Sequence, residues 1–493
     1  MKSKANGWPF AIGVLVIAGV LFLPMPTAGA VMRIPQRVNP QTLASVLAWF
    51  LAAAGFWGFK VRFWPNDRRE RRRFRNCVLL LVLQAILLRG VFETANAYHA
   101  PIPDWLPAQA WVWVPWFLIP ALTGMLLGSR YGIVLCLTGA LMLYLLADPG
   151  PWPLLGCLTS PLAGILLMRR SLTRMRVLRA GIGAGAVLGM VTASYYSIGT
   201  APMAAISVAG LVPWGLSLLC AFLVLAVLPV LEWMLGELSD VTLIEYGTDH
   251  RLLDQLRTSA PGTWCHSLNV ADLAEKAAAQ IGARALFCKT SALYHDIGKL
   301  KDPPLFAENN DGPSPHEALE PQVSAQRIIE HVSYGIELAR RHRLPKAFRE
   351  IITEHHGVSV VRFFYAKACQ PLPDGTQPRV NRALFCYPGP APSSKESGII
   401  ALADCVEAAS RSVSSRSEPD LRAFVRKLLA DRISEGELAE CPLTLADLAK
   451  IEAAFVEWLK GRNHFRPAYP GTATQAAPVH LATAENQQAR QPA

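Results

Sequence analysis

The stretch Tyr294-His295-Asp296-Ile297-Gly298-Lys299 decides how the second half of this chain is interpreted. A histidine followed directly by an aspartate places an imidazole and a carboxylate about 100° apart on a helical turn. The two side chains can then reach two different metal ions, or the aspartate can bridge both. A His-Asp pair by itself is common and carries little information. Here His266 precedes the stretch, and His331, the pair His355-His356 and Asp404 follow it.

Five imidazoles and two carboxylates therefore have to be explained together. Imidazole nitrogens suit Fe, Mn or Zn, and aspartate oxygens suit a bridging position between two ions. Each residue alone is read more simply as an ordinary core or surface side chain. The chain has only 11 histidines among 493 residues, however, and they cluster in this region. The sequence therefore predicts a metal centre built from these seven residues.

The first half of the chain has the composition of a membrane domain. Overall, 52% of the residues are hydrophobic and only 17% are charged, and the charges are unevenly spread. Apolar runs near or above the roughly 20 residues that cross a bilayer as a helix dominate this half. Eight such runs are expected to span the membrane: 8–28, 42–59, 77–94, 110–128, 131–148, 151–168, 178–199 and 206–235.

Basic residues in the loops predict the orientation of these helices. The loops Lys60–Asn76 and Met168–Arg179 are rich in arginine, whereas Thr94–Gln109 contains neither Lys nor Arg. Eight crossings then place both chain ends, and the second half of the chain, on the cytoplasmic side of the membrane. We expect this membrane to be a bacterial inner membrane. The first run ends in Thr27-Ala28-Gly29-Ala30, which is similar to a signal-peptidase site. We interpret this run as an uncleaved anchor, with a cleaved signal as the alternative.

The net charge of +11 does not indicate binding to a nucleic-acid polymer. Much of the excess lies in the clusters Lys60–Arg75 and Arg169–Arg179, beside apolar segments, where it fits contact with the lipid bilayer and its anionic headgroups. The spans carry no pattern of acidic, Lys or His residues that would indicate transport. We therefore interpret the bundle as an anchor or sensor. The ten cysteines form no CxxC pair and are expected to be reduced.

The second half is expected to be an all-α soluble domain. Thr263 is expected to cap a helix that carries His266, and Asp296 is placed in the next helix. Further helices are expected at 322–341, 345–357, 395–413, 419–433 and 445–460, with 301–320 as a loop over a site. The connector before this domain is either a rigid linker or a signalling helix, and the sequence does not separate the two.

The domain boundaries follow from these patterns. We expect an N-terminal anchor or signal-like helix at 1–30, a transmembrane bundle of about seven helices at 31–235, a connector helix at 236–260, an all-α domain that carries the candidate metal ligands at 261–470 and a disordered tail at 471–493. The resemblance described next implies that the domain 261–470 is a metal-dependent phosphohydrolase.

The order H…HD…H…HH…D resembles that of the HD-domain metal-dependent phosphohydrolases. From about Leu238 to Pro470 the chain resembles more closely the seven-transmembrane HD-domain family, the membrane-bound cyclic di-AMP phosphodiesterases. The matching strings include APGTWCHSL at 260–268, ALYHDIGK at 292–299, EHHG at 354–357, YPGP at 387–390, SKE at 394–396 and ADCVEAASRS at 403–412.

This resemblance implies two divalent metal ions, Mn or Fe. It assigns His266, His295, Asp296 and Asp404 to one ion, and assigns Asp296, His331, His355 and His356 to the other, with Asp296 bridging. It implies that an activated water hydrolyses cyclic di-AMP to the linear dinucleotide 5′-pApA in second-messenger turnover. His295 and Asp296 would be catalytic through the metals. Lys299 would be catalytic and would contact the phosphate, and Arg411, two turns after Asp404, would also bind substrate.

The chain departs from the family at three points. The connection 31–42 is too short for the large extracellular domain that members usually carry, Cys265 stands where a second His is frequent, and the Gly-Tyr-Pro run of cyclic di-GMP enzymes is missing after the His pair. The alternatives are an HD hydrolase of cyclic di-GMP or of another nucleotide, and a membrane receptor that only binds a ligand. The chain is compatible with a homodimer but does not determine its oligomeric state.

Overall fold

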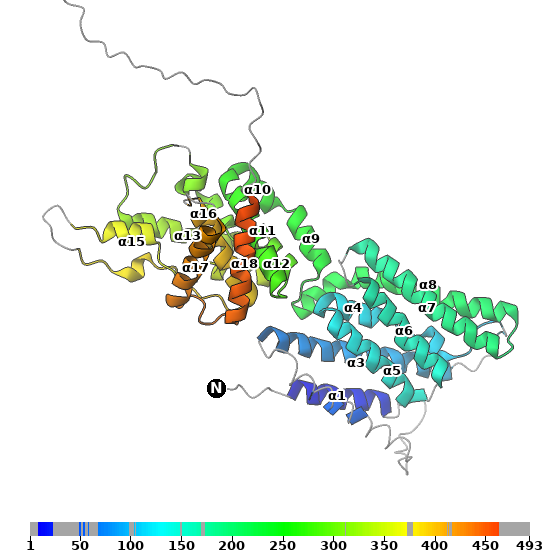
Figure 1. The fold of residues 1–493 in the computed structure, drawn as a ribbon. Helices are drawn as coiled ribbons and strands as arrows, with labels where there is room; N and C mark the ends of the chain where they lie inside the picture. Colours follow the sequence, from blue (N-terminus) through cyan, green and yellow to red (C-terminus); the bar gives the residue numbers. More distant parts are fainter. Residues whose placement is uncertain are drawn as a thin grey trace, which may run out of the picture.

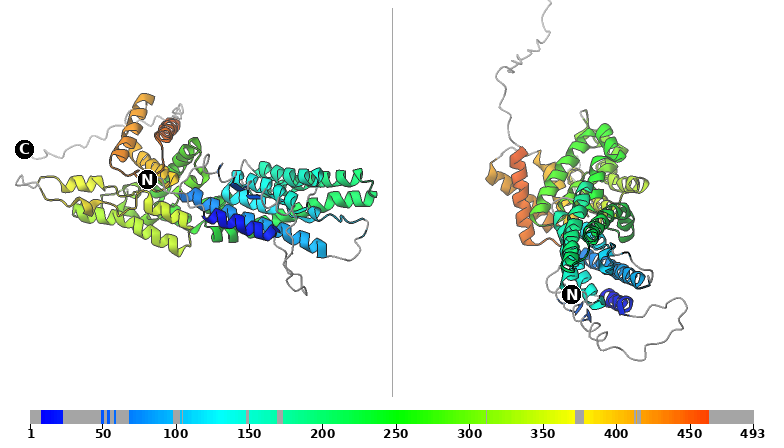
Figure 2. Two further views of the ribbon diagram at one scale, coloured as in Figure 1. Left: turned by 90° about the horizontal axis from the view of Figure 1, so that it is seen from below. Right: turned by 90° about the vertical axis from the view of Figure 1, so that its right-hand side faces the viewer.

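The computed structural model describes residues 8–22, 49–50, 53–54, 58, 68–97, 103, 105–147, 150–168, 173–310, 312–371, 378–411, 413 and 417–462. The described residues form helices joined by turns, and the one β-type pairing among them is an isolated bridge between Val360 and Cys386. The all-α expectation is confirmed. Figures 1 and 2 show a helical bundle with a second helical domain at one end of it.

The bundle contains five described helices that are long and apolar enough to cross a membrane. They are α3 (Arg68–Ala97), α5 (Ser129–Ala147), α6 (Pro151–Met168), α7 (Arg174–Ile198) and α8 (Met203–Leu235). Two shorter helices accompany them, α1 (Trp8–Phe22) and α4 (Leu118–Leu127). Gly181, Gly185 and Gly189 of α7 lie against the backbone of α8, because a Cβ on any of them would come within 3 Å of that backbone. Small residues therefore allow this helix pair to pack closely.

Two expectations about the bundle are wrong. The apolar run 110–128 is not one spanning helix, because it forms the 3-10 turn η1 (Ala110–Trp113) followed by the short helix α4. Pro115 stands between the two and has no amide hydrogen with which to continue a helix. The arginine-rich segment expected as a loop is helical from Arg68 onward and forms the first turns of α3. Most of the run 42–59 and the tail expected at 471–493 lie outside the described residues.

A short elbow, residues Leu235–Ser239, joins the bundle to the second domain. Gly236 takes a left-handed conformation, with φ of +65°, that ends α8. Asn76 of α3 donates a hydrogen bond to the Leu235 carbonyl, at 3.0 Å. Arg284 of the second domain donates to the Leu238 carbonyl. The elbow is therefore hydrogen-bonded to both domains.

The elbow also carries a buried carboxylate. The Glu237 side chain is 1% exposed, and its oxygens lie 3.0 Å from Nε of Arg72 and 3.6 Å from Nε of Arg73, both on α3. A carboxylate at this depth is stable only when it is paired. The ion pairs therefore fix the start of the second domain to the end of α3 that carries the arginine cluster.

Replacing Glu237 with alanine is expected to destabilise the full chain by about 1–3 kcal/mol. This is less than the roughly 3–5 kcal/mol typical of a fully buried pair, because Arg72 remains partly exposed. Thermal unfolding in lipid nanodiscs measures the loss. The matched control is Glu245→Ala, which removes an ion pair with Arg174 that is exposed on both sides and is therefore worth about 0–1 kcal/mol. Equal effects of the two substitutions would contradict the assignment.

The connector is two helices rather than one, α9 (Asp240–Thr248) and α10 (Arg251–Ser259). Ser239 and His250 cap them by accepting amide hydrogen bonds from Thr242 and Leu252. The chain changes direction between α9 and α10, and the second cap starts a new helix there. A single connector helix is therefore not formed.

The second domain is built around α11 (Pro261–Gln280) and α16 (Lys395–Ser410). Around them lie α12 (Ala285–Ala292), α13 (Pro321–Arg341), α14 (Lys346–Glu354), α15 (Arg362–Ala368), α17 (Glu418–Ser434) and α18 (Leu445–Arg462), with the 3-10 turns η2 (Ile297–Lys301), η3 (Pro303–Leu305), η4 (Ala307–Asn309) and η5 (Arg382–Phe385). Its core includes the fully buried rings of Tyr294, Phe348 and Phe455. The helices expected from the sequence are therefore present, but α14 ends at Glu354, so the pair His355-His356 lies in the turn that follows and not in the helix as expected.

Thr263 does not cap α11, contrary to the expectation. Ala260 is the N-cap and Pro261 occupies the first helical position. The backbone amide of Thr263 donates to Oδ1 of Asn309, and its hydroxyl donates to Oε1 of Glu308. Thr263 thus holds Glu308 and Asn309 against α11. Phe306 and Glu308 line the cavity described below, as expected of a loop over a site.

Candidate metal centre

The His295-Asp296 pair lies in a turn between α12 and η2, not in a regular helix as expected. Close packing against α13 explains the difference. A Cβ at Gly298 would lie only 1.7 Å from the carbonyl oxygen of His331, so only glycine allows this approach. The tight turn is what brings the carboxylate of Asp296 within reach of α13.

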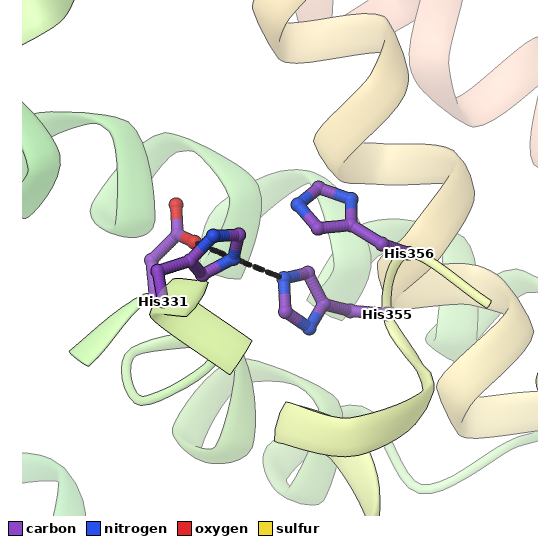
Figure 3. Close-up of side chains that lie close together, drawn as sticks. His331, His355 and His356 are labelled. Atoms are coloured by element: carbon purple, nitrogen blue, oxygen red, sulfur yellow. Dashed lines mark hydrogen bonds and ion pairs between the residues drawn. The ribbon is translucent and has the colours of Figure 1, made fainter. Parts of the chain in front are cut away.

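Asp296 and three imidazoles form the first ligand group. Their ligand atoms all lie within 4.8 Å of one another. Oδ1 of Asp296 is 3.4 Å from Nε2 of His331 and 3.8 Å from Nε2 of His355, and these two nitrogens are 3.4 Å apart. His356 completes the group. Figure 3 shows His331 and His355 pointing toward each other with His356 beside them.

The other oxygen of Asp296 belongs to the second ligand group. Oδ2 lies 3.3 Å from Nε2 of His295 and 3.6 Å from Nε2 of His266. Oδ1 of Asp404 lies 2.9 Å from His266 Nε2 and 3.8 Å from His295 Nε2. Asp404 also approaches Nδ1 of His356, at 3.6 Å. All seven predicted residues therefore lie together, and Asp296 is shared between the two groups.

Hydrogen bonds on the outer side of the rings orient these imidazoles. His295, His331 and His355 each face, through Nδ1, the backbone carbonyl three residues earlier, at 2.7, 2.6 and 2.8 Å. When Nδ1 carries the proton, Nε2 keeps a lone pair directed at the centre, as metal-binding histidines require. His295 Nε2 and Asp296 Oδ1 are buried and have no hydrogen-bond partner within the described part of the chain. Such atoms fit a site that binds divalent metal.

The charge states agree with this arrangement. Burial lowers the pKa of His331 below its ordinary value, and burial together with His295 lowers the pKa of His355 to about 3. Burial and His355 hold the pKa of His356 well below its ordinary value. The first group therefore offers three neutral nitrogens at physiological pH.

In the second group the carboxylates dominate. Burial lowers the pKa of His295, but Asp296 and Asp404 outweigh it and raise that pKa to about 10. Burial opposes ionisation of both aspartates, yet His295 and Lys299 keep the pKa of Asp296 well below its ordinary value, and His266 and His295 do the same for Asp404. A divalent cation would displace the proton from His295, because metal ligands must be deprotonated.

A cavity of about 450 Å³ opens beside the two groups. His266, His331, His356 and Asp404 are among the residues that line it. Both predicted substrate contacts, Lys299 and Arg411, line it as well. The other three predicted residues, His295, Asp296 and His355, contact residues of this lining.

Lys299 is not a surface charge. Its Nζ lies 2.7 Å from Oδ2 of Asp296 and 2.7 Å from Oε1 of Glu308, and it stands 4.9 Å from the ring centre of Phe306. Burial lowers the pKa of Lys299, but the two carboxylates outweigh this and raise it above the ordinary value. Lys299 is therefore a fixed cation beside the Asp296 oxygen that belongs to the second ligand group.

Sequence reasoning missed three residues that contact the predicted ones. Glu407 is fully buried and lies 2.5 Å from Nδ1 of His266. Its spacing of three residues from Asp404 on a helix was the available signal. Glu308 holds Lys299, and the ring of Tyr387 packs on His356 with centroids 4.3 Å apart. The available signals were the position of Glu308 in the expected loop 301–320 and that of Tyr387 in the matching string YPGP, but neither signal identified the contact that each residue makes.

Comparison with known proteins gives two family matches. Residues 263–409 match the HD domain family, and residues 41–239 match the family described as a 7TM receptor with intracellular HD hydrolase. The cyclic-di-AMP phosphodiesterase PgpH of Bacillus subtilis is 29% identical over 450 residues, which are 89% of this chain and 62% of that protein. PgpH of Listeria monocytogenes is 36% identical over 246 residues, which are 50% of this chain and 34% of that protein.

A solved structure is similar as well. The crystal structure of the L. monocytogenes PgpH HD domain in complex with cyclic-di-AMP is 36% identical, covering 45% of this chain and all of that chain, with a TM-score of 0.41. This chain spans less than two thirds of the length of either curated PgpH protein.

Proposed function

This chain belongs to the family that joins a seven-helix membrane domain to an HD hydrolase domain, and from that premise we propose that it is a membrane-bound metal-dependent phosphodiesterase acting on a cyclic dinucleotide. We assign cyclic di-AMP as the substrate and the linear dinucleotide 5′-pApA as the product. The relatives with this architecture that carry an assigned activity are cyclic-di-AMP phosphodiesterases.

The observation that carries the proposal is the sharing of Asp296 between two ligand groups beside one cavity. Two oxygens of one carboxylate, each facing a different set of imidazoles, suit two divalent ions held side by side. We assign His266, His295, Asp296 and Asp404 to one ion, and Asp296, His331, His355 and His356 to the other. The donor set of imidazoles and carboxylates fits Mn or Fe.

The bound ions would supply an activated water and neutralise phosphate oxygens. The residues of this chain do the rest. Lys299 is held in place by Asp296 and Glu308 and can donate to a phosphate oxygen in the cavity. Arg411, nearly half exposed on the cavity wall, is placed to bind a phosphate oxygen as well. The water oxygen attaches to phosphorus, the bond to the ribose 3′ oxygen breaks, and that oxygen takes up a proton.

The position in the cell is also part of the proposal. The arginine-rich start of α3 lies at the end of the bundle that contacts the second domain, through Arg72 and Arg73. By the positive-inside rule this end faces the cytoplasm. We therefore place the hydrolase domain, 261–470, in the cytoplasm and the bundle, 31–235, in a bacterial inner membrane. A homodimer is compatible with this arrangement.

Two alternative functions compete with the proposed one. A hydrolase of cyclic di-GMP or of another nucleotide would use the same metal chemistry. A receptor that only binds its ligand would not need two complete ligand groups, and here all seven ligand residues are present and gathered. Catalysis is therefore the better explanation of the site.

One experiment separates the three readings. The full chain in lipid nanodiscs, loaded with Mn²⁺, is incubated with cyclic di-AMP and with cyclic di-GMP, and the products are resolved by chromatography. We expect cyclic di-AMP to be converted to the linear dinucleotide, the activity to vanish with EDTA, and Mn²⁺ to restore it. Cleavage of cyclic di-GMP alone would keep the chemistry and discard the substrate. Tight binding without cleavage of either would favour the receptor.

A further inference from the structure

Glu407 distinguishes His266 from the other imidazoles of the site. His295, His331 and His355 each use Nδ1 to reach a neutral backbone carbonyl three residues earlier in the chain. His266 instead reaches Oε2 of Glu407 at 2.5 Å, across 141 residues of sequence. The outer partner of His266 is therefore a side chain that can carry a full negative charge.

The carboxylate of Glu407 is held firmly in this position. It is 0% exposed. Asn269, one turn after His266 on α11, donates from Nδ2 to its second oxygen at 3.0 Å. Arg411, one turn after it on α16, lies 3.4 Å from the oxygen that faces His266. Contacts from two helices therefore fix the carboxylate against the imidazole.

We propose that Glu407 is a positioning residue that makes the two metal positions unequal, by strengthening His266 as a ligand of the ion held with His295, Asp296 and Asp404. This inference rests on the metal centre of the proposed function. An imidazole hydrogen-bonded to a carboxylate donates its other lone pair more strongly than one bonded to a carbonyl. The ion beside His266 is thus the more tightly held, and the ion bound by the three remaining imidazoles is the more exchangeable.

The same carboxylate connects the metal centre to the cavity wall. Arg411 lines the cavity and contacts Glu407, which contacts His266. A phosphate that binds Arg411 therefore contacts a side chain that is linked to the proposed metal ligand His266 through Glu407. Glu407 accordingly orients one ligand and one substrate contact at once.

The test measures metal binding without substrate, so it does not depend on the identity of the dinucleotide. The full chain in nanodiscs is stripped with a chelator and titrated with Mn²⁺, and bound metal is quantified by equilibrium dialysis with elemental analysis. We expect the wild type to bind two ions. Glu407→Gln, which keeps the shape and removes the charge, is expected to weaken one of them by about 10–100-fold and to leave the other unchanged.

Electron paramagnetic resonance adds a signature that a general loss of packing would not produce. As Mn²⁺ is added, the wild type is expected to give the spectrum of isolated Mn²⁺ first and the spectrum of a coupled pair once both positions fill. Glu407→Gln is expected to give the coupled-pair spectrum only at higher Mn²⁺ concentrations, because the weakened position fills later.

Two further variants make the result decisive. Glu396→Gln changes a buried carboxylate on the same helix that accepts a hydrogen bond from the backbone amide of Arg284, and it is expected to bind Mn²⁺ like the wild type. Asn269→Ala loosens Glu407 without removing its charge and is expected to weaken the same ion to a smaller extent. If Glu407→Gln does not fold, Asn269→Ala decides the question.

Three outcomes would overturn the inference: two ions bound by Glu407→Gln with wild-type affinity, an equal loss in Glu396→Gln, or unchanged binding in Asn269→Ala when Glu407→Gln is unfolded. In each case the wild type still binds two ions, and the proposed function stands. A wild type that binds no Mn²⁺ would instead remove the metal centre itself.

Discussion

Replacing Asp296 with asparagine is expected to abolish hydrolysis of the cyclic dinucleotide. Asp296 belongs to both ligand groups, with Oδ1 toward His331 and His355 and Oδ2 toward His266 and His295. An amide has no negative charge to share between two cations, and its NH₂ group cannot ligate. We expect kcat/KM to fall by at least about a thousandfold, which corresponds to the loss of about 4 kcal/mol of transition-state stabilisation.

The measurement pairs a rate assay with elemental analysis of bound metal. Asp296→Asn should retain at most one ion, while insertion into the membrane and the helical content stay as in the wild type. Asp302→Asn is the control, since it lies in the same segment and forms no contact with the site imidazoles among those described. A variant at position 296 that keeps two ions and near-normal turnover would show that the site has been misassigned.

Replacing Gly298 with alanine is expected to have the second large effect on metal binding and hydrolysis, although it adds only one methyl group. Its Cβ would meet the His331 carbonyl oxygen at 1.7 Å and the Gly335 amide nitrogen at 2.7 Å, both of them backbone atoms that cannot rotate away. The turn that carries His295, Asp296 and Lys299 must then move off α13. We expect metal binding and hydrolysis to be lost, together with about 1–3 kcal/mol or more of stability from overpacking.

The same substitution elsewhere provides the control. A Cβ at Gly461, near the end of α18, meets no atom within 4 Å, and alanine is the better helix former. Gly461→Ala is therefore expected to be neutral or slightly stabilising, with normal metal content. Normal metal binding by Gly298→Ala would mean that the turn can shift without disturbing the ligands, which would contradict the packing argument.

Much of the fold could be predicted from the sequence because its signals are local. Apolar runs predicted the membrane bundle, and the amphipathic periodicity of 322–341 and 445–460 predicted α13 and α18 closely. The errors arose where local pattern competes with backbone chemistry or packing. The run 110–128 is apolar enough to span a membrane, but Pro115 divides it. The connector has the pattern of one helix, but its caps make it two.

The seven proposed ligands were also identifiable in advance, because imidazoles and carboxylates are scarce in this chain and their order is distinctive. Their partners were not. Many other glutamates and tyrosines occur in the sequence, and nothing in residue type distinguishes Glu308, Tyr387 and Glu407 from them. Only the contacts that these three make in the folded structure give them a role. Glu308 holds Lys299, Tyr387 packs on His356, and Glu407 faces His266.

The sequence by itself thus determined which residues are candidate metal ligands, which segments are apolar enough to cross a membrane and where most of the helices lie. The tertiary structure alone decided that Asp296 lies between two groups of imidazoles, and that His266 differs from His295, His331 and His355 because its Nδ1 faces the buried carboxylate of Glu407. The physical reason is distance along the chain. Composition and periodicity act over a few residues, whereas a metal site is made by helices up to 141 residues apart, whose side chains meet only when the core has packed.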